Sequence, residues 1–235
     1  MLSQKHITVI IPALNEEASI GKVIREIPTF VDQVVVVDNN STDATRDVAE
    51  KTGARVIEEP RTGYGRACLT GIEAAGKTDI FAFINGSYSD YPDDLNPLVE
   101  SVATDQCDLA IGCRQENPNE ARGRFRHQKW GTQLACLTIW LLHRYRFEDL
   151  GPLRCISAPA LRHLQMQDED FGWTSEMQVK AVKTRQTIVQ IPVRYRKRIG
   201  KSKISGTLKG SLMAGYKIFY WIFRLAVSSK LPAYR

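Results

Sequence analysis

The first half of the chain alternates strand-like apolar runs with helical patterns, and this alternation limits the fold more than any other feature. Strands are indicated at 7–12, 33–38, 54–59, 79–85 and 108–113. Between them apolar residues recur at helical spacing, as at Ile20, Val23, Ile24 and Ile27. Asn15 and Ser41 are expected to cap the first two helices. Apolar strands alternating with helices predict a doubly wound, mostly parallel α/β sheet with both faces covered.

The alternation weakens after Arg114. Residues 114–131 are polar, basic and aperiodic, which predicts a loop, and a hydrophobic helix is expected at about 131–142. The stretch 206–230 has a helical period that places five large residues on one side: Leu212, Tyr216, Phe219, Tyr220 and Phe223. We expect one α/β domain over 1–208, divided at 114/115 into two halves, and a basic amphipathic helix over 209–235.

Charge divides the chain sharply. The net charge is +6, yet no Asp or Glu follows Glu176, whereas 14 Lys and Arg do, so residues 1–176 carry a net charge of −8. A basic tail is suited to phosphate groups, an anionic membrane surface or nucleic acid, and otherwise forms a solvated basic face. Of these partners we expect phosphate and membrane rather than nucleic acid.

Cysteine usage and hydropathy indicate the compartment. The five cysteines are scattered without a C-x-x-C pair, which suits reduced thiols. The first residues do not resemble a signal peptide, and the apolar runs near 134–142 and 218–223 are too short to span a bilayer. The expectation is a cytoplasmic protein, peripheral on the inner face of a membrane.

Polar residues at strand ends indicate where a ligand binds. The first strand is followed by Pro12 and Ala13 rather than by a G-x-G-x-x-G turn, and no P-loop is present, so the Rossmann and P-loop classes are excluded. Asp38 ends the second strand, where its carboxylate can accept hydrogen bonds from a base or ribose, or merely cap the next helix. Gly65, after the third strand, would let a nucleotide approach the backbone.

Eight stretches, in order from residue 9 to about 207, resemble the family-2 glycosyltransferases, in particular the dolichol-phosphate mannosyltransferase branch. They are VIIPALNEEASI, VVVVDNNSTDAT, EEPRTGYGRACLTGI, FINGSYSDYPDDL, IGCR, EDLGPLRCI, GWTSEMQVKA and VRYRKRIGKSKISGT. The resemblance implies a GT-A fold, like that of nucleotide-diphospho-sugar transferases, with a sugar-nucleotide half (1–114) and an acceptor half (115–208). It also implies transfer of a sugar from a UDP- or GDP-linked donor to a lipid phosphate or another acceptor.

The resemblance also implies roles for individual residues. Those expected at the nucleotide are Pro12, Ala13, Asn15, Glu16, Asp38, Asn40, Gly65, Asn85, Gly86 and Ser87. Those expected at the acceptor or the phosphates are Arg114, Arg154, Arg198, Lys201, Ser202 and Lys203. Asp149 and Glu176 are the catalytic candidates, and Glu176 would be the base for a hydroxyl acceptor, whereas a phosphate acceptor is already ionised and needs none. Alternatively, Asp149 caps a turn and Glu176 is an exposed helix residue.

The fourth strand raises a question about turnover. In the resembling family it ends in D-x-D, whose carboxylates hold Mg²⁺ or Mn²⁺ on the donor diphosphate, but this chain has Asn85 and Ser87 at those positions. Two neutral oxygens are poor ligands for a hard cation, although Asp90, Asp93 or Asp94 could supply a displaced carboxylate. The expectation is a glycosyltransferase with impaired metal dependence; the alternatives are an inactive sugar-nucleotide-binding protein and a membrane-surface scaffold.

Overall fold

The computed structural model describes residues 5–116, 126–200 and 208–228. Seven strands form one sheet in the order β3-β2-β1-β4-β6-β5-β7. Their bounds are β1 Ile7–Ala13, β2 Gln33–Asp38, β3 Arg55–Glu58, β4 Ile80–Phe83, β5 Leu109–Glu116, β6 Arg154–Ser157 and β7 Ile188–Tyr195. All neighbouring pairs are parallel except those that β6 makes with β4 and β5. The predicted mostly parallel α/β sheet is therefore confirmed.

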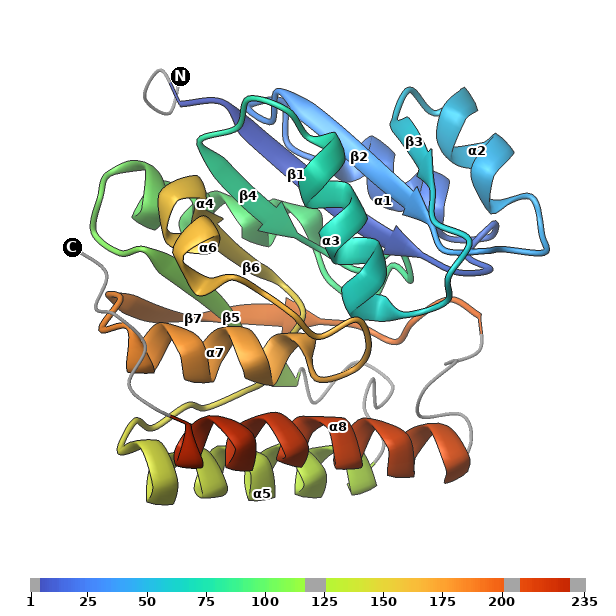
Figure 1. The fold of residues 1–235 in the computed structure, drawn as a ribbon. Helices are drawn as coiled ribbons and strands as arrows, with labels where there is room; N and C mark the ends of the chain where they lie inside the picture. The colour runs from blue at the N-terminus through green and yellow to red at the C-terminus, as the bar shows by residue number, and fades with distance from the viewer. Residues whose placement is uncertain (1–4, 117–125, 201–207, 229–235) are drawn as a thin grey trace.

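Helices cover both faces of this sheet (Figure 1). On one face lie α1 Ile20–Glu26, α2 Thr45–Lys51 and α4 Leu95–Ala103, the last preceded by the short 3₁₀ helix η1 Pro92–Asp94. On the other face lie α3 Tyr64–Ala74, α6 Ala158–Leu164 and α7 Trp173–Lys183. The central strands are buried throughout, as a sheet covered on both faces requires.

Two further helices, α5 Arg126–His143 and α8 Leu208–Val227, lie side by side at the bottom of Figure 1. α8 packs on α7 and α5, and its Trp221, Ile222 and Leu225 belong to the main hydrophobic core. α5 begins five residues before the predicted start of about 131, inside the segment expected to be a loop. In both helices the first residue lies at the right of Figure 1, the side toward which β1 points.

The two expected helix caps are wrong. The residues at the N-caps of α1 and α2 are Ser19 and Ala44, so both helices begin later than predicted. Asn15 and Ser41 instead bond to each other's loops: the N–H of Asn15 donates to Ser41 Oγ at 2.9 Å, and Asn15 Oδ1 accepts from the N–H of Thr42 at 2.7 Å. These bonds hold together the loops that follow β1 and β2.

Candidate functional site

The carboxyl ends of β1, β2 and β4 bring together residues that are far apart in sequence. Ala13 is in register with Asp38 across the β1–β2 pair. A Cβ atom added to Gly86 would lie 3.5 Å from both Ala13 Cβ and Pro12 O, so the turn after β4 packs against the end of β1. We call Pro12, Ala13, Asn15, Glu16, Asp38 and Gly86 the strand-end cluster. It contains six of the ten residues expected at the nucleotide, and Asn85 and Ser87 adjoin it.

Asp38 has the chemistry of a ligand-binding residue in this cluster. Its side chain is 8% exposed, and Oδ1 is buried without a hydrogen-bond partner among the described residues. Leaving a buried carboxylate oxygen unpaired is costly, and such groups in native proteins are usually satisfied. A ligand N–H or O–H would satisfy it. The neighbouring Asn40 is exposed and has a left-handed φ of 66°.

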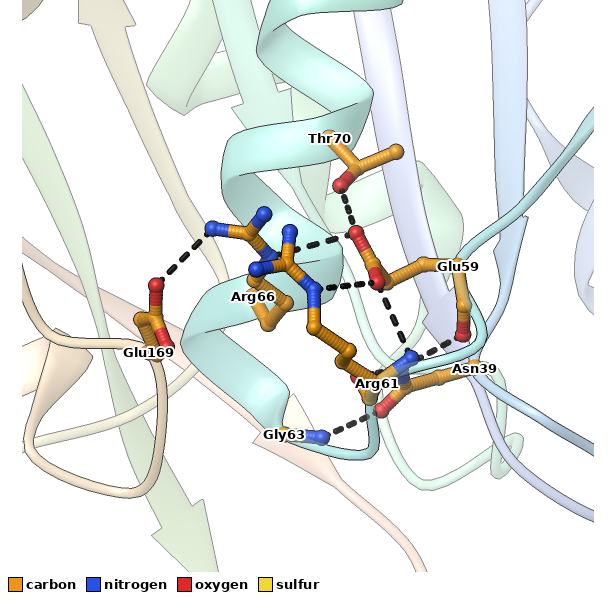
Figure 2. A network of polar contacts seen from close by, with 7 residues as sticks. All are labelled: Asn39, Glu59, Arg61, Gly63, Arg66, Thr70 and Glu169. Atoms are coloured by element: carbon orange, nitrogen blue, oxygen red, sulfur yellow. Dashed lines mark hydrogen bonds and ion pairs between the residues drawn. The ribbon is translucent and has the colours of Figure 1, made fainter.

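A buried network around Glu59 shapes the loop that follows β3 (Figure 2). Glu59 is 5% exposed, and its carboxylate accepts from Arg61 N at 3.0 Å, Arg66 Nε at 3.2 Å and Thr70 Oγ1 at 2.6 Å. Asn39 spans the same loop, donating to the carbonyls of Glu59 and Arg61 and accepting from the N–H of Gly63. The side chain of Arg61 is left 61% exposed beside β2. Asn39 and Glu59 were not among the predicted site residues.

Gly65 does not have the role expected for it. A Cβ atom there would lie 2.0 Å from the carbonyl oxygen of Asp168, and one at Gly63 would lie 2.2 Å from that of Glu169. The N–H groups of Gly65 and Arg66 donate to the carbonyls of Asp170 and Glu169. The glycine therefore admits the 168–170 loop, a protein segment, to the start of α3, and this contact by itself requires a residue without a side chain.

The turn after β4 carries neutral groups. Ser87 and Ser89 are 4% and 2% exposed, and their hydroxyl oxygens lie 3.0 Å apart in a hydrogen bond. Asn85 is half-buried. None of these side chains carries the negative charge that a hard divalent cation prefers.

The three downstream aspartates do not restore a pair of carboxylates at this turn. Asp94 is held by Arg194, whose N–H, Nε and guanidinium NH₂ all donate to it at 2.6–2.9 Å. Asp93 is exposed on η1. Asp90 is only 1% exposed, and both of its carboxylate oxygens are buried without a hydrogen-bond partner among the described residues. No group of three His, Cys, Asp or Glu side chains within residues 5–116, 126–200 and 208–228 could hold a metal ion. The residues present do not fit the Mg²⁺ or Mn²⁺ site that the family implies.

Arg114 and Asp149 form a bidentate ion pair. Arg114 Nε and a terminal guanidinium nitrogen donate to the two carboxylate oxygens at 2.6 and 2.7 Å, and the backbone N–H of Arg114 adds a third bond at 3.1 Å. Asp149 is 3% exposed. The Arg114 guanidinium also lies over the ring of Tyr195, and the pairing with Asp149 raises its pKa despite burial. The carboxylate is thus occupied in holding Arg114 in place.

Arg154 and Glu176 are both fully buried. Arg154 donates to the carbonyls of Gly151 and Thr174, and burial lowers the pKa of its guanidinium to about 10. The two oxygens of Glu176 accept from the N–H groups of Gln167 and Asp168 at 2.9 and 2.7 Å. Glu176 is therefore not the exposed helix residue of the alternative interpretation, and neither side chain reaches the surface to meet an acceptor.

Glu176 also has a charged partner. Its carboxylate lies 2.6 Å from Lys180 Nζ, one helical turn further along α7. Burial raises the pKa of Glu176, and Lys180 opposes that shift. The pair holds the start of the 167–172 loop against α7.

The basic segment after β7 crosses the strand-end cluster. The N–H groups of Arg196 and Ile199 donate to the carbonyls of Ser89 and Ser87 at 2.9 and 3.0 Å. The guanidinium of Arg198 donates to Glu16 Oε1 at 2.6 Å. The predicted phosphate-binding residues Lys201, Ser202 and Lys203 lie outside the described residues. Among the residues of this segment that the structure describes, Arg198 is the cation that contacts the strand-end cluster.

Known proteins resemble this chain over most of its length. The model of a family described as glycosyl transferase family 2 matches residues 8–161. An uncharacterized glycosyltransferase of Mycobacterium tuberculosis (strain ATCC 25618 / H37Rv) is 37% identical over 213 residues, covering 88% of this chain and 94% of that protein. The UDP-N-acetylglucosamine–dolichyl-phosphate N-acetylglucosaminyltransferase of Methanococcus voltae is 27% identical, covering 98% and 100% of the two chains.

Solved structures share the fold. Glucosyl-3-phosphoglycerate synthase from Mycobacterium tuberculosis, in complex with Mn²⁺, UDP and glucosyl-3-phosphoglycerate, superposes with a TM-score of 0.79 at 22% identity. The superposition covers 95% of this chain and 81% of that one. The fold is therefore that of the GT-A nucleotide-diphospho-sugar transferases, as predicted.

Proposed function

Because the chain belongs to glycosyl transferase family 2, whose model matches residues 8–161, we propose that it transfers a sugar from a nucleoside-diphosphate donor to a lipid phosphate. The observation that carries the donor assignment is the buried, unpartnered Oδ1 of Asp38 in the strand-end cluster. A base or ribose donor group would complete its hydrogen bonding. Asn15 and Glu16 line the same loop, and Arg198 reaches it from the basic segment.

The base of the donor is proposed to be uracil, with guanine as the second choice. The M. voltae relative is named for a UDP-linked sugar, and the M. tuberculosis synthase structure contains UDP. Lys201, Ser202 and Lys203 are proposed to join Arg198 at the diphosphate.

The acceptor follows from the state of the carboxylates. A hydroxyl acceptor needs a general base, whereas a phosphate acceptor is already ionised. Both acidic residues expected near the chemistry are engaged: Asp149 by Arg114, and Glu176 by Lys180 and two backbone N–H groups. A phosphate acceptor removes the need for either as a base. Relatives of this chain include two named for dolichyl phosphate, from M. voltae and Haloferax volcanii.

A lipid-borne acceptor is consistent with the surface that α5 and α8 form. Twelve large apolar side chains are exposed on these two helices: Trp130, Leu134, Leu137, Trp140, Leu141, Leu142, Leu212, Met213, Tyr216, Tyr220, Phe223 and Val227. Neither helix contains an Asp or Glu, whereas Lys217 and Arg224 lie on α8. Exposed patches of this kind mark interaction sites, and aromatic side chains beside cations suit an anionic lipid interface.

We propose that this surface, named here the α5–α8 face, lies on an anionic bilayer. Among the described residues no helix combines the length and apolarity needed to cross a membrane. Association is therefore proposed to be peripheral. The first turns of both helices point toward the end of the sheet where the strand-end cluster lies, so a lipid phosphate would approach the cluster from this layer.

The proposal is tested by thermal melting of the full chain against UDP, GDP, UDP-sugars and GDP-sugars, with and without Mn²⁺. A ligand that binds only the folded state raises the melting temperature by mass action, whether or not turnover occurs. We expect a rise with uridine nucleotides, saturating with concentration. No shift with any nucleotide would contradict the donor assignment. Binding without transfer would favour the inactive sugar-nucleotide-binding alternative, which the neutral Asn85 and Ser87 suggest.

A further inference from the structure

We propose that this protein binds the diphosphate of its donor without a divalent cation, with the Arg198 guanidinium supplying the counter-charge; this deepens, and rests on, the donor site proposed above. The starting observation is a mismatch between the turn after β4 and a hard cation. Mg²⁺ and Mn²⁺ bind through carboxylate and phosphate oxygens, and a protein site for them has to offer fixed negative charge. The turn offers an amide and two hydroxyls, of Asn85, Ser87 and Ser89.

The surrounding acidic groups restore little of that charge. Asp94 is neutralised by Arg194, and Asp149 by Arg114, each through two guanidinium contacts of 2.6–2.9 Å. Asp90 is buried at 1% exposure, and neither of its carboxylate oxygens has a hydrogen-bond partner among the described residues. A cation at this turn would therefore lose much of its hydration and gain a single unpaired carboxylate, that of Asp90, from these three aspartates.

A positive charge is already present at the same place. The backbone N–H of Ile199 donates to the carbonyl oxygen of Ser87, which fixes the 196–199 segment along the turn. Arg198, the preceding residue, reaches Glu16 of the strand-end cluster at 2.6 Å. Its side chain is 26% exposed, and its Nε is buried with no hydrogen-bond partner among the described residues.

Arg198 therefore has one N–H group that is buried beside the site without a protein hydrogen-bond partner. A guanidinium presents several N–H groups in a planar fork and binds phosphate oxygens through charge-assisted hydrogen bonds. Glu16 orients that fork in the absence of donor. A donor diphosphate would bind this guanidinium through N–H groups that the protein does not use.

Two neighbouring arginines, Arg196 of the segment and Arg194 of β7, are less suited to this task. The guanidinium of Arg196 is stacked on the rings of Tyr88 and Tyr91 at 3.3 and 4.2 Å and pairs with Glu26 at 3.0 Å. Arg194 is held by Asp94. Arg194 therefore serves as a matched control, since it is a nearby arginine whose partner lies outside the strand-end cluster.

The experiment is a calorimetric titration of the full chain with UDP and with GDP, in EDTA and in Mn²⁺. We expect the dissociation constant of the preferred nucleotide in EDTA to lie within about threefold of that in Mn²⁺. Arg198→Gln should weaken binding in EDTA by about 10- to 100-fold, the range for losing a charge-assisted hydrogen bond. Arg194→Gln should bind as the parent does, and melting curves should show all three proteins folded.

Adding carboxylates to the turn after β4 gives a second, independent test. Asn85→Asp, alone and with Ser87→Asp, should make nucleotide binding at least tenfold tighter in Mn²⁺ than in EDTA. The single variant is included because Asn85 is half-buried and nearly isosteric with Asp, so it folds even if the buried Ser87 position does not accept a charge.

The outcomes separate the two proposals. Binding by the parent that appears only with Mn²⁺, or Arg198→Gln binding that equals that of Arg194→Gln, overturns cation-free binding and leaves the donor assignment standing. An Asn85→Asp protein that binds nucleotide without any metal response shows that the turn does not face the diphosphate. That result also overturns cation-free binding. If neither nucleotide binds under any condition, the proposed function itself fails.

Discussion

The indole N–H of Trp221, on α8, donates a hydrogen bond to the carboxylate of Asp168, and both side chains are buried. The other oxygen of Asp168 accepts from the N–H groups of Asp170 and Gly172 at 2.7 and 3.0 Å. The same loop packs on the start of α3 through Gly65. Contacts therefore connect α8 to the 168–172 loop, and this loop in turn to the start of α3.

The first prediction concerns this link. Trp221→Phe removes the donor and leaves a buried carboxylate oxygen of Asp168 short of a partner, which should lower the free energy of unfolding by about 1–3 kcal/mol. Equilibrium urea unfolding measures it. Tyr220→Phe, at an exposed position of the same helix, is the control and should change the free energy of unfolding by less than about 0.5 kcal/mol. Equal effects would mean that the Trp221–Asp168 bond contributes nothing.

The second prediction concerns Asp38. Asp38→Ala should weaken uridine nucleotide binding by about 1.5–3 kcal/mol, because it removes a charged hydrogen-bond acceptor, while leaving the melting temperature nearly unchanged. Calorimetry at fixed pH gives both the affinity and the stoichiometry. Asp47→Ala, on the exposed side of α2, is the matched loss of charge. Unchanged affinity in Asp38→Ala would remove this residue from the donor site.

The third prediction concerns the α5–α8 face. Leu137→Glu with Leu141→Glu should reduce sedimentation with phosphatidylglycerol vesicles at least tenfold, because burying a leucine side chain contributes about 1.5–3 kcal/mol and acidic groups are repelled by this lipid. Gln106→Glu, which adds an acidic group in the turn before β5, should sediment nearly as the parent does. If the double variant instead loses self-association and keeps vesicle binding, the face is a contact between two copies of the chain.

The fourth prediction is a pH dependence of stability. Burial raises the pKa of Asp90 from 3.8 to about 6, partly opposed by the guanidinium of Arg114; Asp149 adds to the shift, and Arg196 also opposes it. Because the pKa of Asp90 is higher in the folded state than in the unfolded state, the folded state keeps the carboxyl proton up to a higher pH. The stability that the protonated Asp90 carboxyl contributes to the folded state is therefore fully present below about pH 4, and it is lost as the pH rises through about 6.

Asp90→Asn cannot lose that proton, so it isolates the effect. Relative to the variant, the parent should lose up to about 3 kcal/mol of unfolding free energy between pH 4 and pH 7, the amount that a shift of roughly two pKa units represents. Urea unfolding of both proteins at intervals across this range measures the difference. Parallel curves for the two proteins would show that Asp90 is not titrating in this window.

The strands of the first half could be predicted because each is a dense apolar run with a clear end. β6 and β7 were not identified: β6 has only four residues and begins with Arg154, whose burial depends on carbonyls of Gly151 and Thr174 that only the folded chain brings near. The resemblance supplied Glu16 and Arg198, which the folded chain brings into contact. It could not supply the Glu59 network, since Asn39, Glu59 and Arg66 meet only after β2, β3 and α3 are in place.

Local pattern also misassigned residues whose partners are distant. Asn15 and Ser41 have the composition of helix caps, yet they bond across 26 residues because the two strands before them are paired. Glycine at position 65 suggested an approaching ligand, whereas the approaching group is the backbone of residues 168–170. In both cases the type of contact was predicted and its partner was not.

The most direct test of the central claim is transfer itself. The full chain is incubated with radiolabelled UDP-glucose or UDP-N-acetylglucosamine and a polyprenyl phosphate in phosphatidylglycerol vesicles, and the label entering the organic phase is counted. We expect label in a lipid product that depends on the polyprenyl phosphate and is lost in Asp38→Ala but retained in Asp47→Ala. If the parent binds these donors in calorimetry yet moves no label to this acceptor or to a panel including GDP-sugars and hydroxyl lipids, the protein is a nucleotide-sugar-binding protein rather than a transferase.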